Sequence, residues 1–245
     1  MDKEQQYREL YAKAEQDKNV IGLALTGGRG KGVFTERSDY DVLVVVKDEA
    51  KQSSKAEYEK FNSTEIVEAS VCTLDELRNK GKWGSEESWA MYGLTHLKAQ
   101  IDKTGDIQKI LDEKGIIPAN EIEKYVNHCI DGFINQYYRA IKNHRDGNSF
   151  AAHLDATESV PMLLSLLFGR EGRIRPYNKF LEWELRNYPL KYLPWSPEEF
   201  LRLTEKTLKT GDIETMKVFF IKLRDTSVQL GFVEAVNGWN GYVLE

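Results

Sequence analysis

Short apolar runs separated by polar turns dominate the first half of the chain. Residues 20–26 form an almost wholly apolar run that ends in glycines, and residues 42–46 form a second run rich in valine. Runs of this length and composition predict buried strands. Residues 3–18 instead repeat their apolar positions with the period of a helix, which predicts a helix beside the first strand. Residues 65–72 and 94–101 are the next strand candidates.

After Pro118 the pattern changes to that of helices. Five helices are expected, joined by turns that carry Gly or Pro: 119–145, 149–170, 176–187, 197–209 and 212–230. Pro161 lies inside the second of these segments and predicts a kink or a second helix start there.

A short helix is also expected after Thr73, which has the position of an N-cap with Glu76 three residues further on. Together these elements predict an α+β fold. Residues 1–115 are expected to form an α/β-type core with a mixed sheet, and residues 116–245 an all-α helical domain.

The turn after the first strand contains four glycines, Gly27, Gly28, Gly30 and Gly32. Glycine permits a positive φ and close approach of another group, and successive amide N–H groups in such a turn form a concavity that binds anions. Arg29 and Lys31 add positive charge to it. Residues 33–37 are expected to form one or two helical turns before the chain returns as a strand.

Two aspartates open that second strand. Strand side chains alternate between faces, so Asp39 and Asp41 are expected on one side and Tyr40 on the other. Carboxylates this close repel each other unless a cation lies between them, and Mg²⁺ typically binds one or two carboxylates together with substrate phosphates. Each motif alone has a simpler interpretation, a common loop or a solvated strand edge. In this order along the chain they favour metal-assisted chemistry on a nucleoside triphosphate.

Leu25-Thr26-Gly27-Gly28, followed after ten residues by Asp39-Tyr40-Asp41-Val42, resembles the signature of the DNA polymerase β nucleotidyltransferase superfamily. Within it, the size and the helical second half are most similar to the small bacterial enzymes that nucleotidylate antibiotics, the aminoglycoside and lincosamide nucleotidyltransferases. The motif covers residues 20–77. A weaker likeness extends to residues 175–179, which contain a Pro-Tyr-x-Lys element.

The resemblance implies a nucleotidyltransferase that uses one or two Mg²⁺ ions and ATP or another nucleoside triphosphate. A nucleoside monophosphate, expected to be AMP, would pass to a hydroxyl of a small molecule such as an antibiotic, with release of pyrophosphate. The alternatives are a protein acceptor, as in toxin–antitoxin pairs, and a non-catalytic nucleotide-binding module. The expected nucleotide-binding residues are Thr26, Gly27, Gly28, Arg29, Lys31, Ser38 and Lys179.

This family usually has a third acid on a neighbouring strand, and Glu68 is the residue expected there. Asp102, at the end of the last strand candidate, is the rival, although Asp-Lys-Thr-Gly also has the composition of a turn. The sequence departs from the commonest family pattern by having Glu at this third place and Gly28 where Ser is frequent. The expected metal ligands are therefore Asp39, Asp41 and Glu68.

The helical domain of residues 116–245 is expected to bind the acceptor substrate, and it offers candidates for the general base. Asp155 and Glu158 are three residues apart on one helix face, and a carboxylate that faced the metal site would accept the proton of an attacking hydroxyl. The resemblance raises this role without choosing between them. Lys179 is the candidate for the triphosphate. The simpler interpretation is that all three are ordinary solvated positions.

Composition limits the partners. The net charge is −5 and the pI is about 5.6, which does not indicate a large basic surface for nucleic acid. The two cysteines, Cys72 and Cys129, have no metal-ligand spacing. The charged N-terminus lacks an apolar core, and no run of about 18 apolar residues follows. A cytoplasmic, soluble protein is expected, as a monomer or a homodimer.

Overall fold

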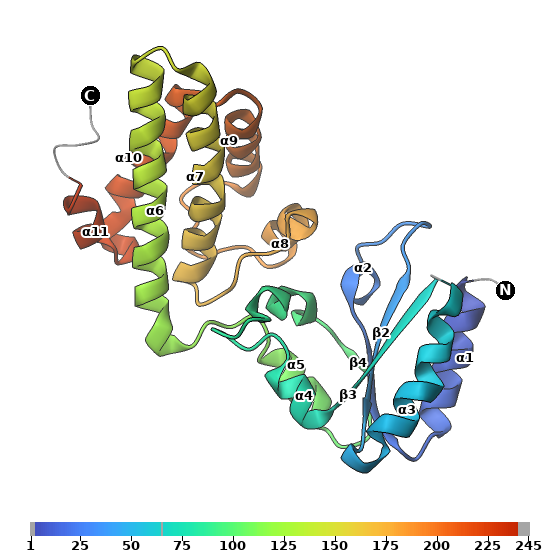
Figure 1. Ribbon diagram of the computed structural model, residues 1–245. Helices are drawn as coiled ribbons and strands as arrows, with labels where there is room; N and C mark the ends of the chain where they lie inside the picture. Colours follow the sequence, from blue (N-terminus) through green and yellow to red (C-terminus); the bar gives the residue numbers. More distant parts are fainter. Residues whose placement is uncertain (1–2, 65, 240–245) are drawn as a thin grey trace. The chain divides into compact units, whose positions relative to one another are not determined.

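The computed structural model describes residues 3–64 and 66–239 (Figure 1). These residues divide into two compact units, the first ending at Ile116 and the second beginning at Ile117. The first unit contains a four-stranded sheet with helices around it, and the described part of the second is built from helices. The predicted fold class, an α+β core followed by a helical region, is confirmed.

The strands of the first unit are β1 (Val20–Leu25), β2 (Tyr40–Val46), β3 (Val67–Thr73) and β4 (Ala99–Asp102). Their order across the sheet is β3-β2-β1-β4. β1 runs antiparallel to β2 and to β4, whereas β2 and β3 are parallel. This topology brings the end of β1 and the beginnings of β2 and β3 to one end of the sheet.

The helices of the first unit are α1 (Lys3–Gln16), α2 (Gly27–Gly30), α3 (Lys51–Tyr58), α4 (Leu74–Asn79) and α5 (Ile107–Asp112). Three 3₁₀ segments accompany them, η1 (Asp48–Ala50), η2 (Glu59–Thr64) and η3 (Ser88–Leu94).

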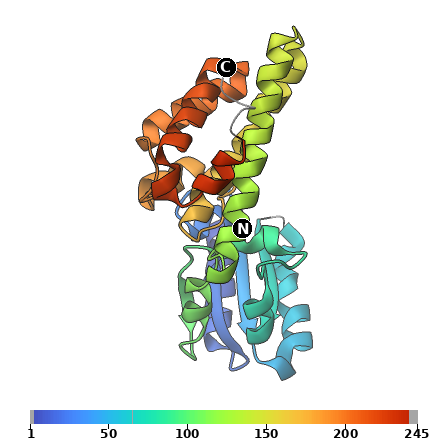
Figure 2. The ribbon, with the colours of Figure 1, turned by 90° about the vertical axis from the view of Figure 1, so that its left-hand side faces the viewer.

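Alternation along the strands gives the sheet a core on each face. Val42 and Val44 of β2 pack with buried residues of α1 and α3, and Leu43 and Val45 pack on the other face with α5 and with Leu77 of α4. Figures 1 and 2 show α1 and α3 covering one face of the sheet and α4 and α5 the other. Most of the sheet is therefore buried on both faces, whereas Glu68 and Ser70 of β3 are exposed.

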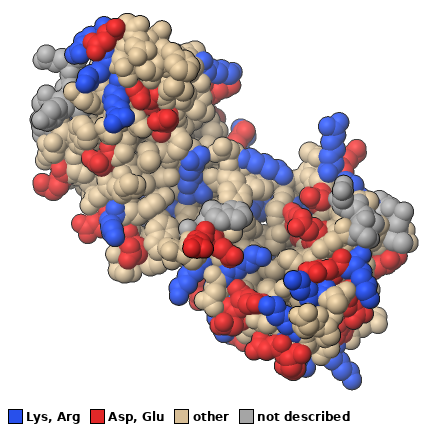
Figure 3. Space-filling view, viewed as in Figure 1, with Lys and Arg blue, Asp and Glu red and all other residues tan. Residues whose placement is uncertain are grey.

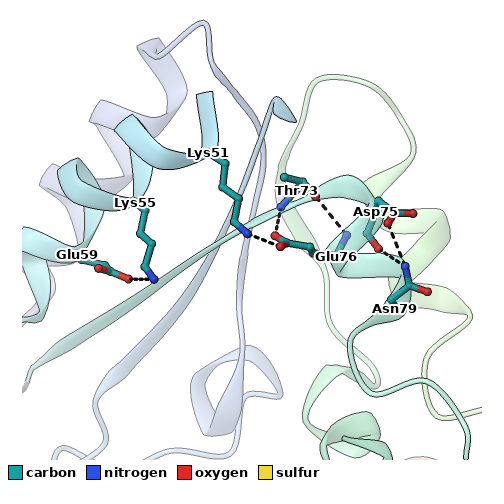
Figure 4. Close-up of polar contacts among 7 residues, drawn as sticks. All are labelled: Lys51, Lys55, Glu59, Thr73, Asp75, Glu76 and Asn79. Atoms are coloured by element: carbon teal, nitrogen blue, oxygen red, sulfur yellow. Dashed lines mark hydrogen bonds and ion pairs between the residues drawn. The ribbon is translucent and has the colours of Figure 1, made fainter. Parts of the chain in front are cut away.

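The predicted helix start at Thr73 is confirmed. The Thr73 hydroxyl accepts a hydrogen bond from the Glu76 amide at 3.3 Å, and the Glu76 carboxylate accepts one from the Thr73 amide at 3.0 Å. Figure 4 shows this reciprocal pair, together with Lys51 of α3 on the same Glu76 carboxylate. The capping box ends β3 and starts α4 at one residue.

Two local predictions in this unit are wrong. Residues 33–37 are not helical, because the glycine segment itself closes the short helix α2, with the Gly30 amide bonded to the Thr26 carbonyl at 2.9 Å. The strand expected from Leu94 begins only at Ala99. His96 has a φ of 55°, in the left-handed region, and this conformation cannot continue an extended strand.

The second unit contains α6 (Ala119–Arg145), α7 (Ser149–Arg170), η4 (Asn178–Phe180), α8 (Leu181–Asn187), α9 (Pro197–Thr210), α10 (Ile213–Leu230) and α11 (Val233–Asn237). The predicted helices are found, with the segment from residue 176 divided into η4 and α8. Pro161 lies within α7, which continues past it as one helix.

The apolar sides of α6, α7, α9 and α10 enclose one large core that includes Phe133, Phe168, Phe200 and Phe219. None of the helices in the described part of the chain combines the length and hydropathy that crossing a lipid bilayer requires. On the face drawn in Figure 3, basic and acidic side chains are intermingled over both units.

Candidate active site

The glycine turn follows β1 directly, forms α2 and lies against β2. The Thr26 amide donates a hydrogen bond to the Asp41 carbonyl at 2.8 Å. Gly27 has a φ of 57°, and a Cβ atom added there would lie 2.1 Å from Oδ2 of Asp41. A Cβ at Gly30 would lie 2.2 Å from the Leu25 carbonyl oxygen. At Gly30 glycine is thus required by close packing against the backbone, whereas a Cβ at Gly27 would displace the Asp41 carboxylate and would also need a left-handed backbone.

The acids predicted to share a strand face lie at the start of β2. Tyr40, between them, is 7% exposed and belongs to the core under α1. Asp41 is half-buried, and Asp39, one residue before β2 begins, is exposed. The alternation of β2 therefore turns Asp41 to the face opposite Tyr40, at the same end of the sheet as the glycine turn.

Strand register decides which acid of another strand joins them. Asp41 is paired directly with Glu68 across the parallel β2–β3 ladder. Paired residues of neighbouring strands project on the same face with Cβ atoms about 5 Å apart. Glu68 is exposed. Asp41 and Glu68 therefore share one face at this end of the sheet, and Asp39 lies at the same end, just before β2.

Asp102 lies elsewhere. It is paired with Gly22 of β1, which in turn is paired with Val45 of β2. Val45 is four residues from Asp41, so Asp102 is displaced along the strands by about 13 Å. Burial acts to raise the pKa of the Asp102 carboxyl, but hydrogen bonds from backbone amides, including those of Gln108 and Gly105, lower it overall. Asp102 closes the turn before α5 and is not a partner of Asp41.

The donor set formed by Asp39, Asp41 and Glu68 suits a hard divalent cation, because all of its atoms are carboxylate oxygens. The Asp41 carboxylate lies directly against the backbone of Gly27, in the position that a side chain at residue 27 would otherwise occupy. Among the residues that the structure describes, no three His, Cys, Asp or Glu side chains are already gathered around one point. Asp41 and Glu68 are neighbours through strand register, and Asp39 precedes β2 at the same end of the sheet.

Arg29 departs from its predicted place. Instead of projecting from the turn toward a phosphate, its guanidinium donates to the backbone carbonyls of Asp39, at 2.9 Å from Nε, and of Ser38, at 3.0 Å from Nη2. The Ser38 hydroxyl accepts a hydrogen bond from the Thr35 amide at 3.0 Å. Arg29 and Ser38 therefore organise the segment that leads into β2.

Lys31 also differs from the expectation of a cation on the surface of the turn. It is 6% exposed, and its ammonium donates to the carbonyl and hydroxyl oxygens of Thr95 and lies 4.8 Å from the centre of the Tyr92 ring. The structure thus gives Lys31 a place in the interior, where it joins the glycine turn to the segment before β4.

That segment was missed by sequence reasoning. Thr95 and Leu97 both lie against the turn, Thr95 through Lys31 and Leu97 within 2.8 Å of a Cβ built on Gly30. His96 between them is the one described non-glycine residue with a positive φ. A backbone of this kind often marks a functional site, but no feature of the sequence around residues 92–97 signals it.

Two of the three candidates in the helical unit lie where α6 meets α7. Asp155 accepts a hydrogen bond from Asn143 Nδ2 at 2.7 Å, and Glu158 accepts one from Gln136 Nε2 at 2.8 Å. Lys179 is exposed on η4, with its ammonium 5.4 Å from the centre of the Phe180 ring. Each unit has its own core, and the catalytic roles of these three residues stay predictions.

Residues 8–114 match the family model of the nucleotidyltransferase domain. None of the curated proteins matches the chain. Among solved structures, a nucleotidyltransferase-like protein from Exiguobacterium sibiricum is 12% identical, with 93% of this chain and 77% of that chain covered and a TM-score of 0.44. Spectinomycin adenyltransferase AAD(9) from Enterococcus faecialis, solved with ATP and spectinomycin, is 14% identical, with 90% and 98% covered and a TM-score of 0.33.

The family match spans nearly all of the first unit, including the glycine turn, Asp39 and the strands that carry Asp41 and Glu68. Both solved structures are distant in sequence and in superposition, and neither identifies a substrate for this chain. The match assigns a nucleotidyltransferase domain to residues 8–114.

Proposed function

We propose that the chain transfers AMP from ATP to a hydroxyl group of a small molecule, such as an aminoglycoside- or lincosamide-like antibiotic, with Mg²⁺ and release of pyrophosphate. The observation that carries this proposal is the direct pairing of Asp41 with Glu68 beside the bare backbone of Gly27. Carboxylate oxygens and open amides at one end of a sheet suit a triphosphate bound with a divalent cation.

Asp39, Asp41 and Glu68 would hold the metal ion in this scheme. When bound, Mg²⁺ neutralises charge that develops on the phosphate oxygens as pyrophosphate leaves. The turn at Gly27 and Gly28 would receive the phosphates through its amides. Asp41 would be the central ligand, because its carboxylate lies against the Gly27 backbone and the residue is paired with Glu68 of β3.

The helical unit would supply the remaining groups. Asp155 or Glu158 would take the proton of the acceptor hydroxyl, since each side chain has a second carboxylate oxygen beyond the one bonded to α6. Lys179, exposed on η4, would bind the triphosphate. A small acceptor fits a chain of net charge −5 better than a nucleic acid does, because the phosphate backbone of nucleic acid requires an extended basic surface.

The test is an acceptor screen with the purified protein, each nucleoside triphosphate and Mg²⁺. Pyrophosphate release is measured, and mass spectrometry looks for an acceptor heavier by one nucleoside monophosphate. Asp41→Asn should abolish both signals, whereas Asp48→Asn, at an exposed position just after β2, should leave them unchanged. If the nucleoside monophosphate is attached to a protein and to no small molecule, the acceptor is a protein and the proposal of a small-molecule acceptor is wrong. Asp41→Asn with normal turnover would refute the site assignment.

A further inference from the structure

We propose that Arg29 is a positioning residue: it fixes the main chain of Ser38 and Asp39, and thereby the carboxylate of Asp39, and does not bind the nucleotide. This inference rests on the proposed function, because it gives Arg29 a task only if Asp39 is a metal ligand.

Asp39 needs such support because it lies outside the sheet. The ladder between β2 and β3 begins with the pair of Tyr40 and Val67, and the Tyr40 amide donates to the Ile66 carbonyl at 2.9 Å. On the other side, the contact with β1 ends with the Thr26 amide on the Asp41 carbonyl. Neither ladder includes Asp39, so its position depends on other contacts.

Arg29 supplies these contacts from ten residues away. Its Nε and Nη2 form one edge of the guanidinium, and both donate to carbonyls of adjacent residues, Asp39 at 2.9 Å and Ser38 at 3.0 Å. Such a two-pronged edge is the part of arginine that would otherwise clasp a phosphate or a carboxylate. Here the guanidinium binds the two carbonyls in place of the backbone amides that a neighbouring strand would supply.

Aromatic rings hold the plane of the guanidinium. Its central carbon lies 3.8 Å from the centre of the Tyr40 ring and 4.7 Å from that of Phe34. The Tyr40 ring in turn stacks on Tyr7 of α1, with ring centres 4.7 Å apart and planes 15° from parallel. Phe34 is 53% exposed, and its contact with Arg29 explains why a large apolar ring stands at that position.

A lysine cannot reproduce this arrangement. It retains the positive charge, but it lacks both the planar group that stacks on rings and the fixed pair of donors. A phosphate ligand would tolerate the change to lysine better than a positioning residue would. A misplacement of about 1 Å in a catalytic group can reduce the rate about 100-fold without loss of substrate affinity.

The experiment compares Arg29→Lys with Arg37→Lys, an exposed arginine of the segment between α2 and β2. Arg29→Lys should lower kcat about 100-fold, with KM for ATP changed less than about threefold. Arg37→Lys should have no effect. Tyr40→Leu should reproduce the loss of kcat because it removes the stacked ring, and Tyr40→Phe should preserve kcat because it keeps the ring. If Arg29→Lys raises KM and leaves kcat unchanged, Arg29 is a nucleotide ligand and the proposal is overturned.

Mn²⁺ binding, followed by electron paramagnetic resonance, gives a readout that is independent of turnover. Arg29→Lys should weaken Mn²⁺ binding about tenfold while the circular dichroism melt stays close to that of the wild type. This loss would support the positioning role even if no acceptor is ever modified, in which case only the proposed function fails. Unchanged Mn²⁺ affinity in Arg29→Lys, or no Mn²⁺ binding by the wild type, would overturn the positioning role.

Discussion

The backbone of Gly27 lies so close to the carboxylate of Asp41 that a Cβ atom at Gly27 would stand 2.1 Å from Oδ2. The two residues come from the turn after β1 and from β2, and they meet because the Thr26 amide is bonded to the Asp41 carbonyl. This contact joins the expected phosphate-binding turn to an expected metal ligand.

Gly27→Ala should therefore abolish nucleotidyl transfer. The new methyl group displaces the Asp41 carboxylate, and the left-handed backbone adds a cost of about 1–2 kcal/mol in stability. Gly32→Ala is the matched control, because Gly32 has a φ of 73° but nothing within 4 Å of its added Cβ. It should lose similar stability and retain transfer. Pyrophosphate release and thermal melting measure the two effects, and equal activity in both variants would contradict the role of the contact.

Glu68→Gln should reduce transfer at least about 100-fold, the scale expected when one preorganised charge is removed from an active site. Asp102→Asn should retain turnover and lose only about 1 kcal/mol of stability, because Asp102 accepts hydrogen bonds in a turn. Initial rates at saturating ATP and Mg²⁺, together with urea unfolding, distinguish the two acids. Loss of transfer in Asp102→Asn with normal transfer in Glu68→Gln would identify Asp102 as the third metal ligand.

The helical unit should lose stability in acid through Asp212, the N-cap of α10. A hydrogen bond from Lys206 and those from Thr215 lower its pKa from 3.8 to about 2. A lowered pKa in the folded state stabilises above the unfolded pKa, so this contribution of about 1–2 kcal/mol is present above pH 4 and disappears toward pH 2. Asp212→Asn still caps the helix and should unfold with a weaker pH dependence in urea titrations between about pH 5 and pH 2.

Arg173→Met should destabilise the helical unit by about 3 kcal/mol. The guanidinium of Arg173 is paired with Glu184, whose side chain is 3% exposed, and it also donates to the Tyr188 carbonyl at 2.9 Å. Removing the arginine leaves a buried carboxylate without this partner. Urea unfolding followed by tryptophan fluorescence gives the loss, and the double variant Arg173→Met, Glu184→Leu should recover part of it. A single variant as stable as the wild type would show that the pair contributes little.

Much of the fold follows from local patterns. The apolar runs from Val20 and Val42 are strands, and Thr73 with Glu76 starts a helix where the capping box predicts it. The predictions for two segments beside the site were wrong: residues 33–37 are not helical, and residues 94–98 are not part of a strand. Their conformations depend on contacts with distant residues, such as Lys31 with Thr95, that no local pattern records.

The order of residues alone determines that Asp41 and Tyr40 face opposite ways, because side-chain alternation is a property of a single strand. Tertiary structure alone decides that Glu68 and not Asp102 lies beside Asp41, since strand register is set by packing between elements far apart in the chain. It also turns Arg29 onto the backbone of Asp39 and buries Lys31. Charge and spacing mark these residues as polar and close to the turn, but the direction of a long side chain depends on the rings and carbonyls that folding brings within its reach.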